Sequence, residues 1–135
     1  MWLLCAVAVS AAPIDDAFLD RLAHAESRGR AVAGDRGRAL GPFQMHAEAW
    51  KDVSRLRAGN DLPTYRRTSH EPTQRLYAQH YLEILAVRFE RARGRQPSHP
   101  ELVALWNLGW DGFRRRGFDL KRIPTPTKKL IERMK

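Results

Sequence analysis

The stretch between residues 29 and 45 constrains the fold more than any other part of this 135-residue chain. It holds four glycines and a proline and has no apolar stripe at helical spacing. Apolar residues at helical spacing do occur on either side of it, over residues 14–27 and 46–56. Because glycine and proline favour turns over helices, we expect a mainly helical fold interrupted once. The interruption is predicted to be a small, irregular β-hairpin over residues 30–45 that turns at Asp35-Arg36-Gly37.

The rest of the chain favours helices. A long helix is expected over about residues 71–93, because a proline in its first turn suits a helix start and an apolar face follows. Ser98 and Glu101 form a capping box that opens another helix, ending near Gly109. The turn-rich residues 110–117 follow, and a last short helix is expected over residues 127–134.

Length and composition indicate a single globular domain, since 43% of the residues are apolar and 29% are charged. The formal net charge of +9 is unusually high and comes mostly from arginine. Such a field attracts polyanions, which include nucleic acid, anionic lipid and acidic cell-wall polymers. Charge alone does not choose among them. The arginines stand in clusters: Arg55/Arg57, Arg66/Arg67, Arg91/Arg93/Arg95 and Arg114/Arg115/Arg116.

Residues 1–12 carry no charged side chain and are too short to cross a bilayer as a helix. An apolar core followed by the small residues Ser10-Ala11-Ala12 is typical of an export signal. No lysine or arginine precedes the apolar run, so an apolar N-terminal helix packed on the core is the alternative. Cys5 is the only cysteine, and it excludes an intramolecular disulfide. We expect an exported protein, periplasmic, envelope-bound or secreted, with a single folded domain in residues 13–135.

Glu26 is the residue that chemistry singles out. It follows Leu22 by four positions, so it leans toward the buried face of the helix over residues 14–27. It also lies in the last helical turn, where the helix dipole disfavours negative charge. Burial and the dipole both raise the pKa of a carboxyl group, and a carboxyl that is protonated near neutral pH can act as a general acid. Taken alone, Glu26 is more simply a surface residue.

The residues around Glu26 change that balance. Ala25-Glu26-Ser27, then Gly34-Asp35, then the run over residues 39–45 resemble the lysozyme-like superfamily. Within it, the chain is most similar to soluble lytic transglycosylases (SLT domains) and to goose-type and invertebrate-type lysozymes. Residues 104–112, Ala-Leu-Trp-Asn-Leu-Gly-Trp-Asp-Gly, resemble the downstream signature of the same group. The resemblance covers about residues 14–117.

The resemblance implies a lysozyme-like α+β fold and cleavage of the β-1,4 bonds between N-acetylmuramic acid and N-acetylglucosamine in peptidoglycan. Glu26 would be the catalytic acid and base, with Ser27 beside it to position it and to contact substrate. Gln44 on the hairpin and Asn107 on the opposite helix would contact the sugar. Gly41 and Gly109 would let the backbone approach closely.

One departure concerns aromatic residues. Members of this group often carry a tyrosine in the last helix that hydrogen-bonds the catalytic glutamate, and residues 127–135 contain none. Either Tyr81 or Tyr77 takes its place, or the acid is less well oriented.

Three of the four tryptophans lie outside the N-terminal segment 1–12. Trp50 and Trp106 stand on apolar stripes and are predicted to be structural. Trp110 lies beside the arginine run, and we expect its ring to stack on a sugar.

Asp35 decides the reaction type. A second carboxylate nine residues after Glu26 could activate water or stabilise the transition state, which would give hydrolysis. Asp-Arg-Gly is also a good turn sequence, in which Asp35 would be structural. The resemblance to lytic transglycosylases implies a single glutamate instead, with the muramyl 6-hydroxyl attacking to leave a 1,6-anhydro product. Both reactions stay open, with a slight preference for the second.

The expected partners are peptidoglycan glycan strands and anionic wall polymers, for a monomer that needs no cofactor and binds no nucleic acid. The five histidines show no metal-ligand spacing. Two other classes of protein remain as alternatives. One is a small basic nucleic-acid-binding protein that uses the arginines of residues 114–116 and their aromatic neighbours. The other is an inactive lysozyme-like module that only binds the wall.

Overall fold

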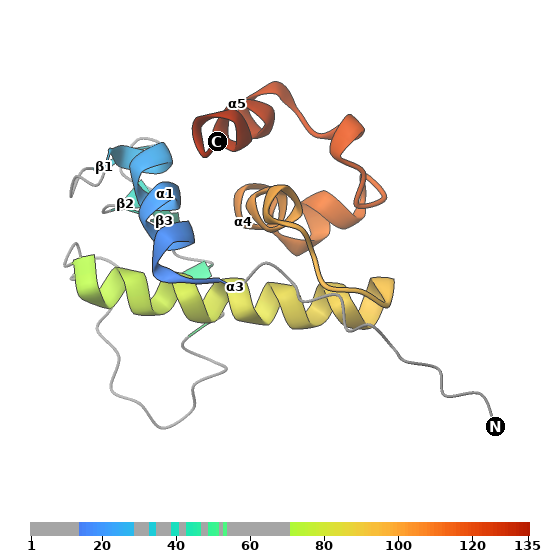
Figure 1. The fold of residues 1–135 in the computed structure, drawn as a ribbon, viewed down its shortest axis with the longest axis horizontal. Helices are drawn as coiled ribbons and strands as arrows, with labels where there is room; N and C mark the ends of the chain where they lie inside the picture. Colours follow the sequence, from blue (N-terminus) through green and yellow to red (C-terminus); the bar gives the residue numbers. More distant parts are fainter. Residues whose placement is uncertain are drawn as a thin grey trace.

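The computed structural model describes residues 14–28, 33–34, 39–40, 43–46, 49–51, 53 and 71–135. The described part is mainly helical, as the sequence predicts (Figure 1). The N-terminal segment 1–12 and the predicted turn at residues 35–37 lie outside the described residues. The helices are α1 (Asp16–Ser27), α3 (Glu71–Arg93), α4 (His99–Arg114), the 3-10 helix η3 (Leu120–Arg122) and α5 (Thr125–Arg133).

Helix α1 begins and ends as its sequence dictates. The Asp15 side chain accepts a hydrogen bond from the Phe18 backbone N–H at 2.8 Å and caps the N-terminus. Phe18 and Leu22 are fully buried in the core. Arg28 adopts a left-handed conformation (φ 57°) and its N–H bonds back to the last turn, which stops the helix directly after Glu26-Ser27.

Three two-residue strands follow α1 and pair antiparallel in the order β1 (Ala33–Gly34), β2 (Ala39–Leu40) and β3 (Met45–His46). Gly34 pairs with Ala39, so the predicted hairpin exists and its connection is residues 35–38. The third strand corrects the prediction that His46 starts a helix: the helical residues 49–51 and 53 come later. The Phe43 N–H donates to Oε1 of the buried Gln74 at 3.3 Å, which ties this segment to α3.

Helix α3 covers residues 71–93 as predicted and lies beneath α1 and α4 (Figure 1). Helix α4 begins at the predicted capping box, in which both the Ser98 and the Glu101 hydrogen bonds are present. Gly109 (φ 72°, ψ 171°) interrupts the helical conformation at the predicted end. The chain then resumes a helix to Arg114, where the sequence predicts turns.

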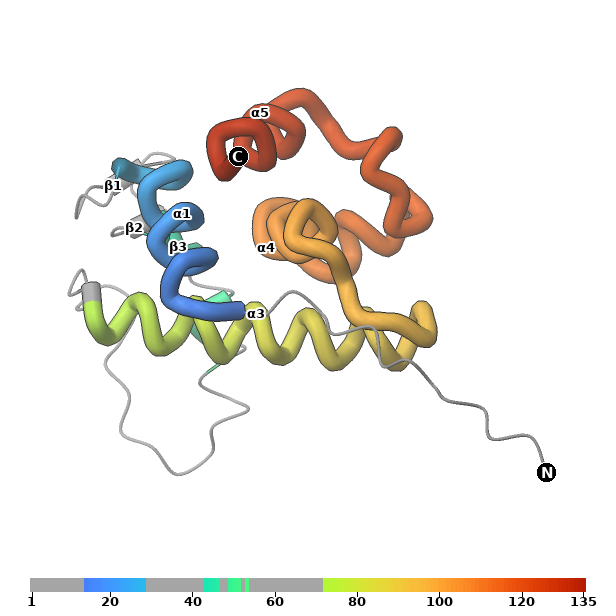
Figure 2. Tube along the Cα trace, viewed as in Figure 1, coloured from blue at the N-terminus to red at the C-terminus, as the bar shows by residue number. Residues whose placement is uncertain are grey.

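Helix α5 starts at Thr125, two residues before its predicted start, and packs against both α4 and α1. Figure 2 shows it on the opposite side of α4 from α3, with its end close to the end of α1. Thr127 and Leu130 are its buried residues. The last helix therefore packs against α1, the helix that carries Glu26 in its last turn. Within the described ranges no helix is both long and apolar enough to span a membrane.

Candidate active site

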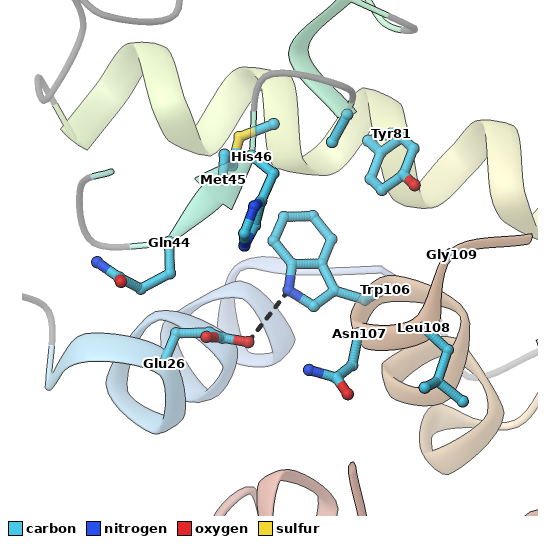
Figure 3. Close-up of a pocket in the computed structure, with 10 residues that line it drawn as sticks. Glu26, Gln44, Met45, His46, Tyr81, Trp106, Asn107, Leu108 and Gly109 are labelled. Atoms are coloured by element: carbon cyan, nitrogen blue, oxygen red, sulfur yellow. Dashed lines mark hydrogen bonds between the residues drawn. The ribbon is translucent and has the colours of Figure 1, made fainter. Parts of the chain in front are cut away.

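A cavity of about 440 Å³ opens where the end of α1, strand β3 and helix α4 meet (Figure 3). It joins five of the site residues predicted from the sequence, which are Glu26, Gln44, Tyr81, Asn107 and Gly109. The helix–hairpin–helix order of the chain thus brings distant motifs to one place. The other lining residues are Met45, His46, Ala49, Trp106 and Leu108.

Glu26 is half-buried in the last turn of α1, with its carboxyl group facing α4 across the cavity (Figure 3). The Trp106 indole Nε1–H donates a hydrogen bond to Glu26 Oε1 at 3.3 Å. This bond joins two residues 80 positions apart. It orients the carboxyl group toward the open space.

Burial raises the pKa of Glu26 from 4.5 to about 7. Two weaker effects act in the opposite direction, because they favour the ionised form. They are the hydrogen bond from Trp106 and the positive charge of Arg133. The carboxyl group can therefore be either protonated or ionised near neutral pH, as a group that both donates and accepts a proton must be.

The end of α1 is held from two directions. The Ser27 hydroxyl donates to the Ala23 carbonyl at 3.1 Å, within its own helix. The Arg133 Nε–H of α5 donates to the Ala25 carbonyl at 3.1 Å. Ser27, predicted to position the acid and contact substrate, is buried and does not line the cavity.

Asn107 forms part of the wall opposite Glu26. Its Oδ1 accepts a hydrogen bond of 2.6 Å from the hydroxyl of Thr127, a fully buried residue of α5. That bond leaves the amide nitrogen directed toward the Glu26 side of the cavity (Figure 3). Asn107 is thus placed to donate to a ligand.

Strand β3 and the residue before it supply the third wall. Gln44 adopts a left-handed backbone (φ 49°), a conformation that asparagine and glycine enter more easily. The His46 ring points from β3 into the space between Gln44 and Trp106 (Figure 3). His46 adds a titratable side chain that the sequence did not single out.

Trp106, predicted to be structural, is the residue that bonds Glu26, while Tyr81 packs edge-on against its ring with centroids 5.7 Å apart. Tyr77 is stacked on Trp50 in the core, with ring centroids 3.7 Å apart, and does not line the cavity. One sequence signal points to Trp106, namely that it directly precedes Asn107. Neighbours on a helix are only about 100° apart, so both can border one cleft.

Trp110, predicted to stack on a sugar, does not line this cavity. Its ring contacts Phe118 at 5.1 Å between centroids, and the Arg88 guanidinium lies 4.5 Å above it. The other two predicted site residues, Asp35 and Gly41, lie outside the described residues.

No group of three histidine, cysteine, aspartate or glutamate side chains among the described residues is arranged to hold a metal ion. Comparison of the chain with protein-family models, curated proteins and solved structures finds no match in any of the three. The functional argument therefore depends on the geometry of the site.

Proposed function

We propose that this protein cleaves the β-1,4 glycosidic bonds between N-acetylmuramic acid and N-acetylglucosamine in peptidoglycan, with Glu26 as general acid and base. One observation carries the proposal: a half-buried carboxyl group with a pKa of about 7 faces an open cavity and is oriented by an indole N–H. The motif resemblance to lysozyme-like proteins supports the choice of substrate.

Protonated Glu26 donates its proton to the glycosidic oxygen as the bond to the anomeric carbon breaks. The resulting carboxylate then takes a proton from the attacking hydroxyl group. A pKa near 7 suits both steps, since neither form of the acid is rare at neutral pH. The Trp106 hydrogen bond keeps the carboxylate in place between the steps.

The cavity has the character of a sugar site. Its volume of about 440 Å³ falls within the range of roughly 300–1,000 Å³ common for ligand pockets. Trp106 and Tyr81 present aromatic surface for the apolar side of a pyranose ring. Gln44 and Asn107 provide amide groups for the hydroxyl and N-acetyl groups of the substrate.

The attacking hydroxyl decides between two reactions. In our preferred version the muramyl 6-hydroxyl attacks and a 1,6-anhydro product results, as the resemblance to lytic transglycosylases implies. Water would give a reducing end, and Asp35 is then the residue to test as its activator. Either reaction takes place outside the cytoplasm and fits the export signal expected in residues 1–12.

The test is clearing of a peptidoglycan suspension, followed by mass spectrometry of the released fragments. We expect clearing by the parent protein and a loss of about 100-fold or more in Glu26→Gln, because the amide cannot donate a proton to the leaving oxygen. Glu83→Gln, an exposed carboxylate on α3, is the matched control and should clear at the parent rate. Anhydro ends in the fragments identify transglycosylation, and reducing ends identify hydrolysis.

Equal clearing by the parent and Glu26→Gln, or no clearing by either, would reject the enzyme. Binding to peptidoglycan without clearing would favour an inactive wall-binding module. Salt-sensitive binding to DNA without clearing would favour the nucleic-acid alternative.

A further inference from the structure

The last helix takes part in the site although it contributes no residue to the cavity lining. Helix α5 is docked through the buried Thr127 and Leu130 and contacts both α1 and α4. Thr127 bonds Asn107 on one wall, and Arg133 bonds the Ala25 carbonyl next to Glu26 on the other. Two contacts from one helix thus reach the two sides of the cavity.

Arg133 meets α1 where the helix has an open acceptor. The last carbonyls of a helix have no partner within it, and a cation near that end is favoured by the helix dipole. The Ala25 carbonyl is one of these groups, and the Arg133 Nε–H occupies it at 3.1 Å. Since Ala25 directly precedes Glu26, this bond fixes the backbone that carries the acid.

We propose that Arg133 is a positioning residue for Glu26: it holds the end of α1 through the Ala25 carbonyl and keeps a positive charge beside the carboxyl group. This inference assigns Arg133 to the glycan-cleaving site and in that respect rests on the proposed function.

The charge of Arg133 matters because burial acts in the opposite direction. Burial favours the protonated acid, whereas a neighbouring cation favours the carboxylate. Without Arg133 the acid would remain protonated to higher pH and would be slower to give its proton to the glycosidic oxygen in the first step. Arg133 thus keeps both forms of Glu26 accessible in one pH range.

Other ionisable groups face Glu26 from the elements packed around it. Strand β3 contributes His46 and α3 contributes Tyr81, whereas α4 contributes the neutral Trp106 and Asn107. His24 and Arg28 lie two residues away on α1 and its cap. Of these, His46 lines the cavity and belongs to the residue type that changes charge near neutral pH. The experiment therefore includes His46→Gln as a second background.

The experiment follows the ¹³C signal of the Glu26 side-chain carboxyl group during a pH titration, with the signal assigned by its absence in Glu26→Gln. Arg133→Gln should move the midpoint upward by about half a unit to one unit, because the attraction to a neighbouring cation is lost. Arg133→Lys, which keeps the charge but not the planar N–H donor, should move it less. The same order is expected in the His46→Gln background.

Lys128→Gln is the matched control, because it removes an equal charge from an exposed position of α5. It should leave the Glu26 midpoint unchanged. Arg133→Met supplies a second neutral variant that keeps the length of the aliphatic stem, in case Arg133→Gln does not fold. An unchanged midpoint in a folded neutral variant, or an equal shift in Lys128→Gln, would overturn the proposal.

Activity gives a second readout. The pH above which clearing of peptidoglycan declines should rise in Arg133→Gln by the same amount as the Glu26 midpoint. The titration needs no substrate, so it tests the role of Arg133 independently of the proposed glycan cleavage. A shifted midpoint in a protein that never clears peptidoglycan would reject the proposed function and support the link between Arg133 and Glu26.

Discussion

At Glu26 the folded protein holds a proton more tightly than the unfolded chain does. The pKa of this carboxyl group is raised from 4.5 to about 7, chiefly by burial. Between those two pH values the folded state binds more protons, so the free energy of unfolding falls as pH rises. The penalty is absent below about pH 4.5 and fully present above about pH 7. The carboxyl group that we propose as the catalytic acid thereby makes the fold less stable above about pH 7.

Replacing Glu26 by glutamine should remove that penalty. The free energy of unfolding of Glu26→Gln minus that of the parent should be larger at pH 8 than at pH 4, by up to about 3 kcal/mol. This value follows because each pKa unit corresponds to about 1.4 kcal/mol. Urea unfolding of both proteins at the two pH values measures the difference. Glu83→Gln, which alters an exposed carboxylate, should show no such dependence on pH. A gain of equal size at both pH values would contradict the assignment of the raised pKa to Glu26.

Trp106 acts on the same carboxyl group through its indole N–H. Trp106→Phe keeps an aromatic ring but removes the donor that favours the ionised acid. The pKa of Glu26 should then rise by up to about one unit, and the alkaline limit of activity should rise with it. A pH–activity profile of glycan cleavage measures this shift. Trp110→Phe, whose ring packs on Phe118 instead, should keep the parent profile.

At the level of whole elements, local patterns predicted the helices well. The Ser98 capping box, the long helix over residues 71–93 and the end of α1 at Ser27 all depend on residues close in sequence, and all are confirmed. Strand β3 is different, because two residues carry no recognisable period. Its pairing with β2 comes from tertiary packing, and so His46 was wrongly predicted to begin a helix.

Only the site residues that belong to recognisable sequence motifs were predicted. Glu26, Gln44 and Asn107 were found because the motifs contain them, and the structure brings all three to one cavity. The two tryptophans of α4 were harder to place, because Gly109 lies between them. Its positive φ turns the chain, so Trp106 faces Glu26 while Trp110 packs on Phe118. The sequence predicted the end of the helix near Gly109 but not the direction that the chain takes after it, so the contacts of the two rings could not be derived from it.

The hydrogen bond from Thr127 of helix α5 to Asn107, on the cavity wall opposite Glu26, can be tested. Thr127→Val keeps the shape of a buried side chain but removes the hydroxyl that bonds Asn107. We expect a loss of about 1 kcal/mol in stability, typical of one hydrogen bond, and a higher KM for glycan with a smaller change in kcat. Urea unfolding and steady-state kinetics measure these effects. Thr125→Val, at an exposed position of the same helix, should change neither stability nor KM. An unchanged KM in Thr127→Val would contradict the idea that Thr127 orients Asn107 for glycan binding.

For the molecule as a whole, the net charge of +9 is distributed unevenly. Arginines of α3 lie over aromatic rings of the segment that follows Gly109: Arg88 over Trp110 and Arg93 over Phe118. Exposed arginines at positions 91 and 115 add to the positive charge of these elements. The Trp110 ring is therefore packed against Arg88 and Phe118 and does not line the cavity. The exposed arginines at positions 91 and 115 are the ones that we propose for contact with an anionic polymer.

Binding to intact cell walls should therefore depend on salt. We expect the amount of protein that sediments with purified walls to fall several-fold between low and high ionic strength, because exposed charges are screened within about 10 Å at 0.1 M salt. The double variant Arg91→Gln/Arg115→Gln should bind less at low salt and respond less to added salt. Unchanged binding in that variant would show that the arginines are only a solvated surface.

The docking of α5 against α1 also has a consequence for the order of folding. The bond between Arg133 and Ala25 spans 108 positions, and the bond between Trp106 and Glu26 spans 80. Contacts this distant along the chain form late, because the entropy of closing the loop must be lost before they are gained. A nascent chain that has not yet made α4 and α5 carries Glu26 as an ordinary, solvated carboxylate. The raised pKa of Glu26, on which the proposed glycan cleavage depends, is thus acquired only when folding is complete.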